Sequence, residues 1–294
     1  PKSIREAAKK AFKNLASKGL TSLHGIFQLQ AGAEMGDMGA YEIPILKSIL
    51  DLIPQSCYVM VFTESPKKLK RLKKPPLNDE DSFGKFKVNC LKLFLDGSFG
   101  AATACMFSPF TDQLDKSGFC VVDSDKIYHQ MKEAHNLGYQ ICVHAIGDKG
   151  NRILVDLYKR LLEEHPREDH RHRIEHASML KEDVIEDIKN LGLIISSQPQ
   201  FVNSEYKWLE KRIGKKRCLY TYPFKTLYEN DIMMVAGSDC PLEDHDVIKG
   251  LHAMVTRNGF VPEQCISIKN ALKAYTINAA YAAFEEKVKG TIEV

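Results

Sequence analysis

Four side chains that can bind a metal ion or move a proton stand within or at the ends of short apolar runs. They are Lys92, His144, His176 and Asp239. Imidazole nitrogens and carboxylate oxygens are ordinary ligands of zinc, and a bound metal ion lowers the pKa of a water molecule. If the runs are successive strands of one barrel, their polar ends face the same mouth, and the set predicts a metal site there.

Lys92 is a charged residue within the apolar segment LKLFLDG. Burial lowers the pKa of an amine. Taken alone, this lysine is equally well explained by an aliphatic stem that carries its ammonium group out to water. Two functional interpretations stay open: an amine that forms a Schiff base with a carbonyl substrate, or an amine neutral enough to take up carbon dioxide as a carbamate. The carbamate would supply oxygen ligands to a metal ion.

Each of the other three residues also has an ordinary structural explanation when taken singly. His144 and His176 could be hydrogen-bonded core histidines. Asp239, which follows Gly237 and Ser238, could cap the next helix. Because both histidines and the aspartate end strand-like runs in the same manner, the set favours metal ligands, and Asp239 could in addition accept and return a proton.

A repeated alternation of strands and helices must position these side chains. Residues 193–195 and 233–236 are unbroken apolar runs, as expected for parallel strands that are buried on both faces. Polar residues gather where several strands end, and no glycine-rich phosphate loop follows the first strand. We therefore predict an α/β protein with a (β/α)8 TIM barrel rather than a doubly wound sheet. The predicted strands cover residues 22–27, 57–63, 88–96, 140–146, 172–177, 193–198 and 233–239.

The intervening stretches carry apolar faces that would pack onto the sheet. Apolar residues recur at helical spacing before Gly19 and again before Pro166. The faces consist of Ile4, Ala8, Phe12 and Leu15 in the first stretch, and of Ile153, Leu154, Leu157 and Leu161 in the second.

The order of these residues and the segments around them resembles the amidohydrolase superfamily. The segments are KLFLDGSFG, VHAIGDKGN, RIEHA and GSDCP, and the closing stretch ALKAYTINAAYAAFEEKVKGTIEV is similar to the last barrel helix of that family. The sequences of these segments are most similar to those of YtcJ-like metal-dependent hydrolases, relatives of the N-substituted formamide deformylases. Five motifs in one order, from about residue 19 to residue 294, make the resemblance specific.

The resemblance implies a role for each matching residue. Lys92 matches the lysine that becomes carboxylated and bridges metal ions. His144 and His176 match the histidines of the more exposed ion, and Asp239 matches the aspartate that binds the deeper ion and moves protons. A substrate-side loop is implied as well, at Asp96, Gly97 and Ser98.

One family feature, a His-x-His pair on the first strand, has no counterpart here. His170 and His172 have the spacing but precede the fifth predicted strand, a position that indicates a charged loop. His24 stands in the first predicted strand without a histidine partner. We therefore expect an incomplete barrel domain at residues 1–288, with its first strand upstream, and the start of a truncated C-terminal β-domain segment at residues 289–294. A shortened homologue is the alternative.

The expected function is hydrolysis of a non-peptide, amide-type carbon–nitrogen bond in a small-molecule substrate by metal-activated water. One or two divalent ions, with zinc expected, would lower the pKa of the water, and Asp239 would take its proton and return it to the leaving nitrogen. The loops at residues 99–118 and 199–223 would shape the pocket, and their aromatic residues are explained equally well by an apolar or ring-bearing amide substrate and by ordinary packing in the core. Two alternatives stay open: a Schiff-base TIM-barrel enzyme that uses Lys92, and a catalytically incompetent barrel that acts as a binding or scaffold protein.

Composition limits the class of protein. A hydrophobic share of 44% is typical of a globular chain, and a formal net charge of +3 is too small to predict a nucleic-acid partner. The sequence contains no run of about 18 apolar residues, so it does not predict a membrane-spanning helix. The basic run at residues 67–74 indicates a solvated loop or helix edge. Eight cysteines without a C-x-x-C pair predict reduced core residues of a cytoplasmic protein, and a homo-oligomer is left open.

Overall fold

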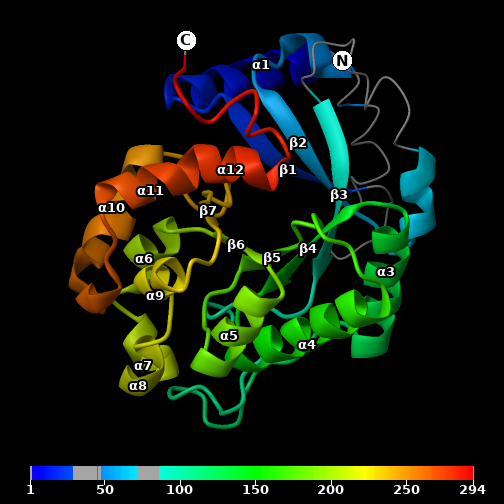
Figure 1. Ribbon diagram of the computed structural model, residues 1–294. Helices are drawn as coiled ribbons and strands as arrows, with labels where there is room; N and C mark the ends of the chain where they lie inside the picture. Colours follow the sequence, from blue (N-terminus) through cyan, green and yellow to red (C-terminus); the bar gives the residue numbers. More distant parts are fainter. Residues whose placement is uncertain (1, 29–44, 46–47, 72–85, 294) are drawn as a thin grey trace. The chain divides into compact units, whose positions relative to one another are not determined.

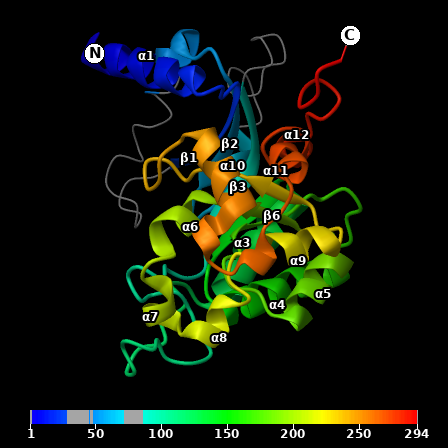
Figure 2. The same ribbon diagram turned by 90° about the vertical axis from the view of Figure 1, so that its left-hand side faces the viewer.

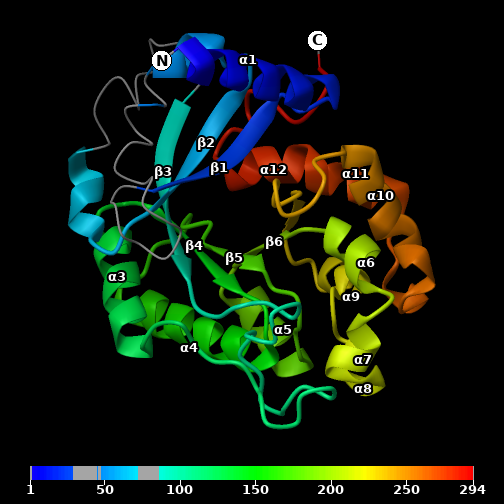
Figure 3. The same ribbon diagram turned by 180° about the vertical axis from the view of Figure 1, so that it is seen from behind.

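The computed structural model describes residues 2–28, 45, 48–71 and 86–293, and Figures 1, 2 and 3 show it from three sides. The chain divides into two compact units. The first comprises residues 1–93 and 129–142, and the second comprises residues 94–128 and 143–294. The strands β3 and β4 each run from the first unit into the second, and the hydrogen-bonded strand order follows the sequence, β1-β2-β3-β4-β5-β6-β7.

Strands and helices alternate along the described chain, as the sequence pattern predicts. The strands are β1 Ser22–Gln28, β2 Ser56–Phe62, β3 Phe86–Phe94, β4 Gln140–Ala145, β5 Arg173–His176, β6 Ile194–Ser197 and β7 Met234–Ala236. The longer helices are α1 Lys2–Ser17, α3 Ser124–Asn136, α4 Asp148–Glu164, α5 Glu182–Asn190, α10 Val247–Thr256 and α11 Ile268–Tyr275. The short ones are α6 Gln200–Glu205, α7 Leu209–Ile213, α8 Lys215–Cys218, α9 Phe224–Glu229, α12 Ile277–Ala282, and the 3-10 turns η1 Leu50–Leu52, η2 Pro66–Arg71, η3 Arg257–Gly259 and η4 Pro262–Gln264.

In the first unit, β1, β2 and β3 pair in parallel and lie side by side in Figure 3. Six of the seven residues of β2 are buried, which agrees with a parallel strand that is covered on both faces. The register places Phe62 beside Lys92, so Lys92 lies near the carboxyl end of β3. His24 lies within β1, with its ring 5.3 Å from the ring of Tyr58.

The helical faces predicted from sequence spacing are confirmed. In α1 the four apolar positions of the predicted face are half-buried and every other described position is exposed. In α4 the predicted positions Leu154, Leu157 and Leu161 are buried, and Ile153 is half-buried. Each of these helices therefore turns its apolar stripe inward, as an amphipathic helix on a sheet must.

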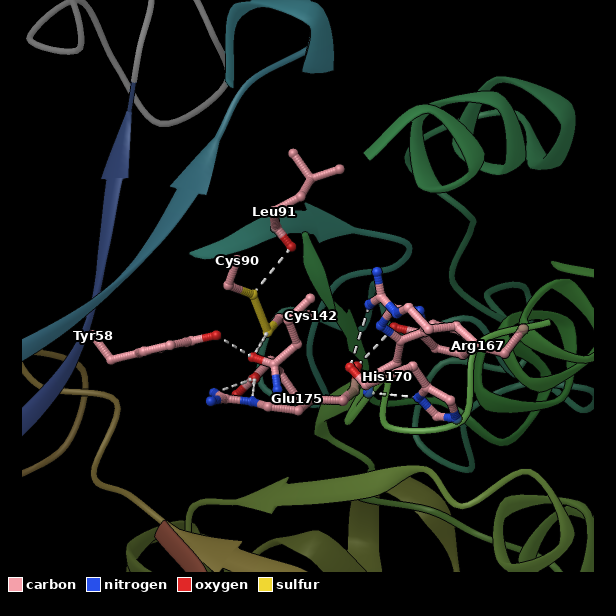
Figure 4. Close-up of a disulfide and its surroundings, with 11 residues drawn as sticks. Tyr58, Cys90, Leu91, Cys142, Arg167, His170 and Glu175 are labelled. Carbon is pink, nitrogen blue, oxygen red and sulfur yellow. Dashed lines mark hydrogen bonds and ion pairs between the residues drawn. A yellow bond between two sulfur atoms is a disulfide. The ribbon is translucent and has the colours of Figure 1, made fainter. Parts of the chain in front are cut away.

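The expectation that every cysteine is reduced is wrong for one pair. Cys90 of β3 and Cys142 of β4 form a disulfide in the first unit, with their Cα atoms 6.6 Å apart (Figure 4). In the same unit the Tyr58 hydroxyl donates a hydrogen bond to Gln140 at 3.0 Å. The two cysteines are 52 residues apart in the chain, and strand neighbours rather than sequence neighbours bring them within bonding reach.

In the second unit, β5, β6 and β7 also pair in parallel, with Ile195 in register with Met234 and Ser197 with Ala236. All eight residues of β5 and β6 are buried. The helices α10, α11 and α12 pack in sequence order, and α11 and α12 contact β7 (Figure 1). Ile194 of β6, Val235 of β7 and Ala282 of α12 form a small buried apolar cluster where these elements meet.

All seven predicted strands occur, but the last of them ends earlier than predicted. The strand β7 stops at Ala236, and Asp239 lies in the segment beyond it with a φ of +61°. A positive φ is incompatible with an extended strand, so Asp239 stands on a turn rather than on the last residue of the strand. The segment after β7 thus decides where this carboxylate points.

Two remaining sequence expectations concern the surface. Within the described ranges, none of the helices is both long and apolar enough to cross a membrane. In the basic run, Lys67, Lys68 and Lys70 are exposed around the buried Leu69 of η2, which agrees with a solvated helix edge. The part of the run at residues 72–74 lies outside the described residues.

Candidate functional site

The structure brings the two predicted histidines together in the second unit. His144 is the penultimate residue of β4 and His176 is the last residue of β5. Their ring centroids are 4.4 Å apart, and the rings meet edge to face at 66°. The end of β5 is tied to the end of β4 because the Ala177 backbone N–H donates to the Ala145 carbonyl at 3.0 Å. Two imidazoles on neighbouring strand ends are therefore close enough to bind the same metal ion or small molecule.

The backbone leaves the extended conformation sharply at His176. This residue has a φ of +73° and the following Ala177 a φ of +47°. Left-handed backbone at two successive non-glycine residues costs free energy, and such strain is concentrated at active sites and ligand-binding segments. The turn directs the His176 side chain toward His144 instead of continuing the alternation of the strand.

His144 also contacts the segment that follows β3. Its Nε2 lies 3.0 Å from the Gly97 carbonyl oxygen, and because a carbonyl can only accept, this nitrogen carries the proton in that bond. The same nitrogen lies 3.5 Å from Oδ1 of Asp96. A further bond, from the Leu95 backbone N–H to the His144 carbonyl at 3.0 Å, aligns the two strand ends. Two residues of the predicted substrate-side loop thus touch a predicted metal ligand.

Asp96 is held inside the protein by backbone donors. Its carboxylate accepts from the N–H groups of Cys105 at 2.9 Å, Ile146 at 2.9 Å and Gly147 at 2.8 Å, and 3% of the residue is exposed. Burial raises the pKa of Asp96 to about 7, against the opposing effect of these three hydrogen bonds. Asp96 therefore joins the segment after β3 to the start of α4.

Two glycines of the segment VHAIGDKGN allow this close approach. A Cβ atom at Gly147 would lie 2.0 Å from the Cys105 carbonyl oxygen, and one at Gly150 would lie 2.6 Å from Oδ2 of Asp96. Beside them, the Asp148 carboxylate accepts from the Phe107 N–H at 3.0 Å. The motif is thus explained by the contacts between the start of α4 and the segment after β3.

Two arginines that were not predicted from the sequence hold the outer part of this segment. Arg212 of α7 donates to the carbonyls of Phe99 at 2.8 Å and Gly100 at 3.1 Å. Arg217 of α8 donates to the carbonyls of Ser108 at 2.9 Å and Pro109 at 2.8 Å. We call Arg212 and Arg217 the arginine clamp. No local sequence signal marks this role, because the four carbonyls that they bind in this segment lie more than 100 residues away in the chain.

The segment after β6 covers His176 from another side. Phe201 of α6 lies with its ring centroid 6.1 Å from that of His176, edge to face. At the end of α6, Glu205 is 7% exposed and accepts a hydrogen bond from the Tyr222 hydroxyl at 2.6 Å. Burial raises the pKa of Glu205 to about 7, the Tyr222 hydrogen bond lowers it, and the charge of Glu243 raises it. Glu205 is thus a second buried carboxyl group in this unit, after Asp96.

The other two predicted ligands are placed as follows. Lys92 belongs to the first unit, where it lies on β3 with 2% of the residue exposed. Asp239 belongs to the second unit, where its carbonyl accepts from the Leu242 N–H at 2.8 Å. Across the part of the chain that the structure describes, no three His, Cys, Asp or Glu side chains form a group arranged to hold a metal ion. The role of Lys92 and Asp239 as ligands therefore stays a prediction.

The segment with His-x-His spacing lies in the loop between α4 and β5, as predicted, but its histidines are buried rather than solvated. His170 is 6% exposed and His172 is fully buried, and their rings are 4.6 Å apart. Nε2 of His170 contacts the Leu191 carbonyl at 3.0 Å, and the ring of His172 stacks on Tyr158. Burial lowers the pKa of His170. Figure 4 shows His170 beside Arg167 within this loop. These histidines pack the base of β5.

Comparison with known proteins relates the chain to one family. A model of the Amidohydrolase family matches residues 2–294. The putative amidohydrolase YtcJ of Bacillus subtilis is 29% identical over 298 residues, which cover 98% of this chain and 54% of that protein. The N-substituted formamide deformylase of Arthrobacter pascens is 22% identical over 219 residues, which cover 69% of this chain and 38% of that protein.

Solved structures show the same similarity. The crystal structure of an uncharacterized metal-dependent hydrolase from Pyrococcus furiosus superimposes with a TM-score of 0.82 at 29% identity, over 97% of this chain and 56% of that one. The chain thus spans about half the length of the relatives that it matches over nearly its whole extent.

Proposed function

Since the chain belongs to the amidohydrolase family, we propose that it forms part of a metal-dependent hydrolase that cleaves a non-peptide, amide-type carbon–nitrogen bond with activated water. The observation that carries this proposal is the edge-to-face pair of His144 and His176 at the ends of neighbouring strands. The similarity to the metal-dependent hydrolase of Pyrococcus furiosus supports it.

The donor set fits a divalent metal ion in part. Two adjacent imidazoles match the preference of zinc for nitrogen ligands. In this proposal Asp239 adds a carboxylate oxygen, and Lys92, once carboxylated, adds carbamate oxygens. One or two ions would be held in the full-length protein. When bound, the ion supplies Lewis-acid chemistry, which lowers the pKa of water and polarises a carbonyl oxygen.

The protein's own residues perform the remaining steps of this mechanism. Asp239 takes the proton of the attacking water and returns it to the leaving nitrogen, so that the amine departs as a neutral group. His144 keeps its orientation through the contacts of Nε2 with Gly97 and Asp96. Phe201 covers the ring of His176 and excludes water from that side. The substrate-side segment of this proposal is Asp96, Gly97 and Ser98, in which the buried Asp96 carboxylate would hold the segment in place from inside.

We also propose that the parallel seven-stranded sheet belongs to a (β/α)8 barrel whose remaining strand is supplied by another part of the full-length protein. Residues 1–288 would form the barrel part, and residues 289–294 would lead into a C-terminal β-domain. The substrate is a small molecule in this proposal. A cytoplasmic location and a homo-oligomeric state stay predictions of the sequence alone.

The proposal is tested on the full-length protein by metal analysis and by hydrolysis of a panel of N-substituted formamides and other small amides. We expect bound zinc or a related divalent ion and release of free amine. His144→Ala and His176→Ala should each lose metal and turnover together. His252→Ala is the matched control, because His252 is an exposed residue of α10, and it should keep both.

The two alternative functions give different outcomes in the same experiment. Turnover that survives thorough chelation and is blocked by borohydride in the presence of substrate, with the label on Lys92, would favour Schiff-base catalysis. A full-length protein that holds no metal and releases no amine from any compound of the panel would favour a binding or scaffold role.

A further inference from the structure

Two cysteines outside the proposed ligand set lie in contact within the second unit. Sγ of Cys105 and Sγ of Cys120 are 3.1 Å apart, and both are free thiols. They come from the two arms of the segment between β3 and α3. The arms are already paired by backbone bonds, from Met106 N–H to the Ser117 carbonyl at 2.8 Å and from Phe119 N–H to the Thr103 carbonyl at 3.3 Å. The contact between the thiols therefore lies between two arms that backbone hydrogen bonds already pair.

Cys105 is held in place on both sides of its side chain. Its N–H donates to Oδ2 of Asp96 at 2.9 Å, and its carbonyl accepts from the Gly150 N–H at 3.0 Å. Because movement of either backbone group would break a hydrogen bond, the main chain of Cys105 is fixed, and its Cβ atom is held on the side of Cys120. A pair of thiols held at this separation can form a disulfide with little movement of the chain.

The two thiols differ in a way that assigns them separate roles. Cys105 is 4% exposed, whereas Cys120 is partly exposed. The hydrogen bond from the Cys105 thiol lowers the pKa of Cys120, while the same contact together with burial raises the pKa of Cys105. A partly exposed thiol with a lowered pKa is the one that reagents in solution reach first.

We propose that Cys105 and Cys120 are a redox-active dithiol, which closes to a reversible intramolecular disulfide by exchange with a low-molecular-weight disulfide such as oxidised glutathione. Cys120 attacks one sulfur of glutathione disulfide as a thiolate, the glutathione S–S bond breaks, and one glutathione thiolate leaves. The Cys105 thiol then gives up its proton and attacks Sγ of Cys120, which releases the second glutathione. Two protein thiols are oxidised and one glutathione disulfide is reduced to two glutathione molecules.

The disulfide would add a covalent link between the two arms, which backbone hydrogen bonds already pair. It would join the arm that contains Phe119 to the arm anchored on Asp96, and Asp96 lies beside His144. The proposal depends on the thiol contact and holds whether or not the chain is a hydrolase.

The test is a peptide map of the full chain after treatment with oxidised glutathione, with free thiols alkylated before digestion without reductant. In the wild-type protein we expect the peptides of Cys105 and Cys120 to be linked, and both to become alkylatable after dithiothreitol. In Cys105→Ser the second step is blocked, so Cys120 should be trapped as its mixed disulfide with glutathione. In Cys120→Ser the buried Cys105 should stay reduced. Cys218→Ser, at a buried free cysteine of α8, is the matched control and should keep the link.

Two results would overturn the proposal. One is a wild-type map in which both thiols remain alkylatable at a glutathione disulfide concentration that modifies other exposed thiols of the chain. The other is a wild-type map in which Cys120 carries glutathione and is never linked to Cys105. Both results are measured on the wild-type protein, so neither depends on whether a variant folds.

Discussion

His144 and His176 acquire their joint geometry from the residues just beyond their strands. Ala177 donates to the Ala145 carbonyl, and the left-handed backbone at His176 turns its ring toward His144. Asp96 contributes from a third strand end, since its carboxylate binds three backbone N–H groups and lies 3.5 Å from His144. At this scale, backbone groups orient the His144 ring and the Asp96 carboxylate, and the left-handed backbone orients His176.

Replacement of Asp239 by Asn in the full-length protein should reduce turnover by about 10²–10⁴-fold with a much smaller change in substrate binding, because the transferred proton is held in the transition state. Asparagine tolerates the left-handed φ of +61° at this position, so the backbone should be kept. Steady-state kinetics and metal content measured on one sample check this. Undiminished turnover in a variant that retains its metal would refute the proton-transfer role of Asp239.

The buried Glu205 should make stability depend on pH. Its pKa is about 7 in the folded protein against an ordinary value of 4.5, so the folded state holds the proton more tightly than the unfolded state. The free energy of unfolding therefore falls as pH rises from about 4.5 to about 7, and Glu205→Gln should remove about 1–3 kcal/mol of that fall. Denaturant unfolding at several pH values measures it.

Glu229→Gln is the control for this measurement, because Glu229 lies on the solvent side of α9 beside Lys225. That variant should keep the pH profile of the wild-type protein. A Glu205→Gln profile that parallels the wild-type profile over the whole window would show that Glu205 is ionised in the folded state at pH 4.5 to 7.

Among the elements, the segment between β3 and α3 depends most on its neighbours. It contains little regular structure, and its hydrogen-bond partners lie on α4, α7 and α8. Long segments without regular structure are held by such contacts when they carry function. The arginine clamp and the start of α4 therefore decide the shape of this segment.

Arg217→Ala should loosen the segment without unfolding the protein. The variant loses donors to the carbonyls of Ser108 and Pro109. A hydrogen bond from a charged group contributes about 1.5–3 kcal/mol, so amide exchange in residues 99–118 should rise about tenfold or more. Hydrogen exchange read by mass spectrometry checks this. Arg160→Ala on α4, where Arg160 pairs with Glu164, is the control, and equal exchange in the two variants would contradict the clamp.

Gly147→Ala should destabilise the contact between this segment and α4. The new methyl group would lie 2.0 Å from the Cys105 carbonyl oxygen, so the backbone must shift, at a cost of about 1–3 kcal/mol. Gly100→Ala is the matched control, since no atom lies within 4 Å of the Cβ it would add. Denaturant midpoints of the two variants measure the difference, and equal midpoints would show that the close approach is absent in solution.

At the scale of the whole molecule, the chain comprises two compact units through which β3 and β4 pass. Lys92 lies in the first unit and the histidine pair in the second. The chain also covers about half of the length of its relatives. The metal site proposed above is therefore a property to be tested on the full-length protein.

Metal removal should destabilise the full-length protein as well as stop turnover. A ligand present at 100 times its dissociation constant adds about 2.7 kcal/mol to the free energy of unfolding when it binds the folded state alone. We expect chelation to lower the Tm by several degrees and zinc to restore it, as read by scanning calorimetry. His144→Ala should show the low Tm with or without zinc. A Tm that zinc and chelator leave unchanged in the wild-type protein would argue against a bound structural or catalytic ion.

Periodicity in the sequence was sufficient to predict all seven strands and the inward faces of α1 and α4. The reason is that burial on both faces leaves unbroken apolar runs and burial on one helical face leaves a repeat of three to four residues. His144 and His176 could be selected as candidates because strand ends are recognisable in the same pattern. The family followed from motifs in a fixed order.

Tertiary structure alone decided which backbone groups hold these residues. The three donors to Asp96, the disulfide of Cys90 with Cys142, and the bonds from Arg212 to Phe99 join residues that are 9 to 113 positions apart. Every residue has a backbone carbonyl, and every residue except proline has a backbone N–H. The sequence therefore does not indicate which of these groups will bind a particular side chain. The Sγ–Sγ contact of Cys105 with Cys120 is equally invisible, because it exists only once the two arms of their segment have paired.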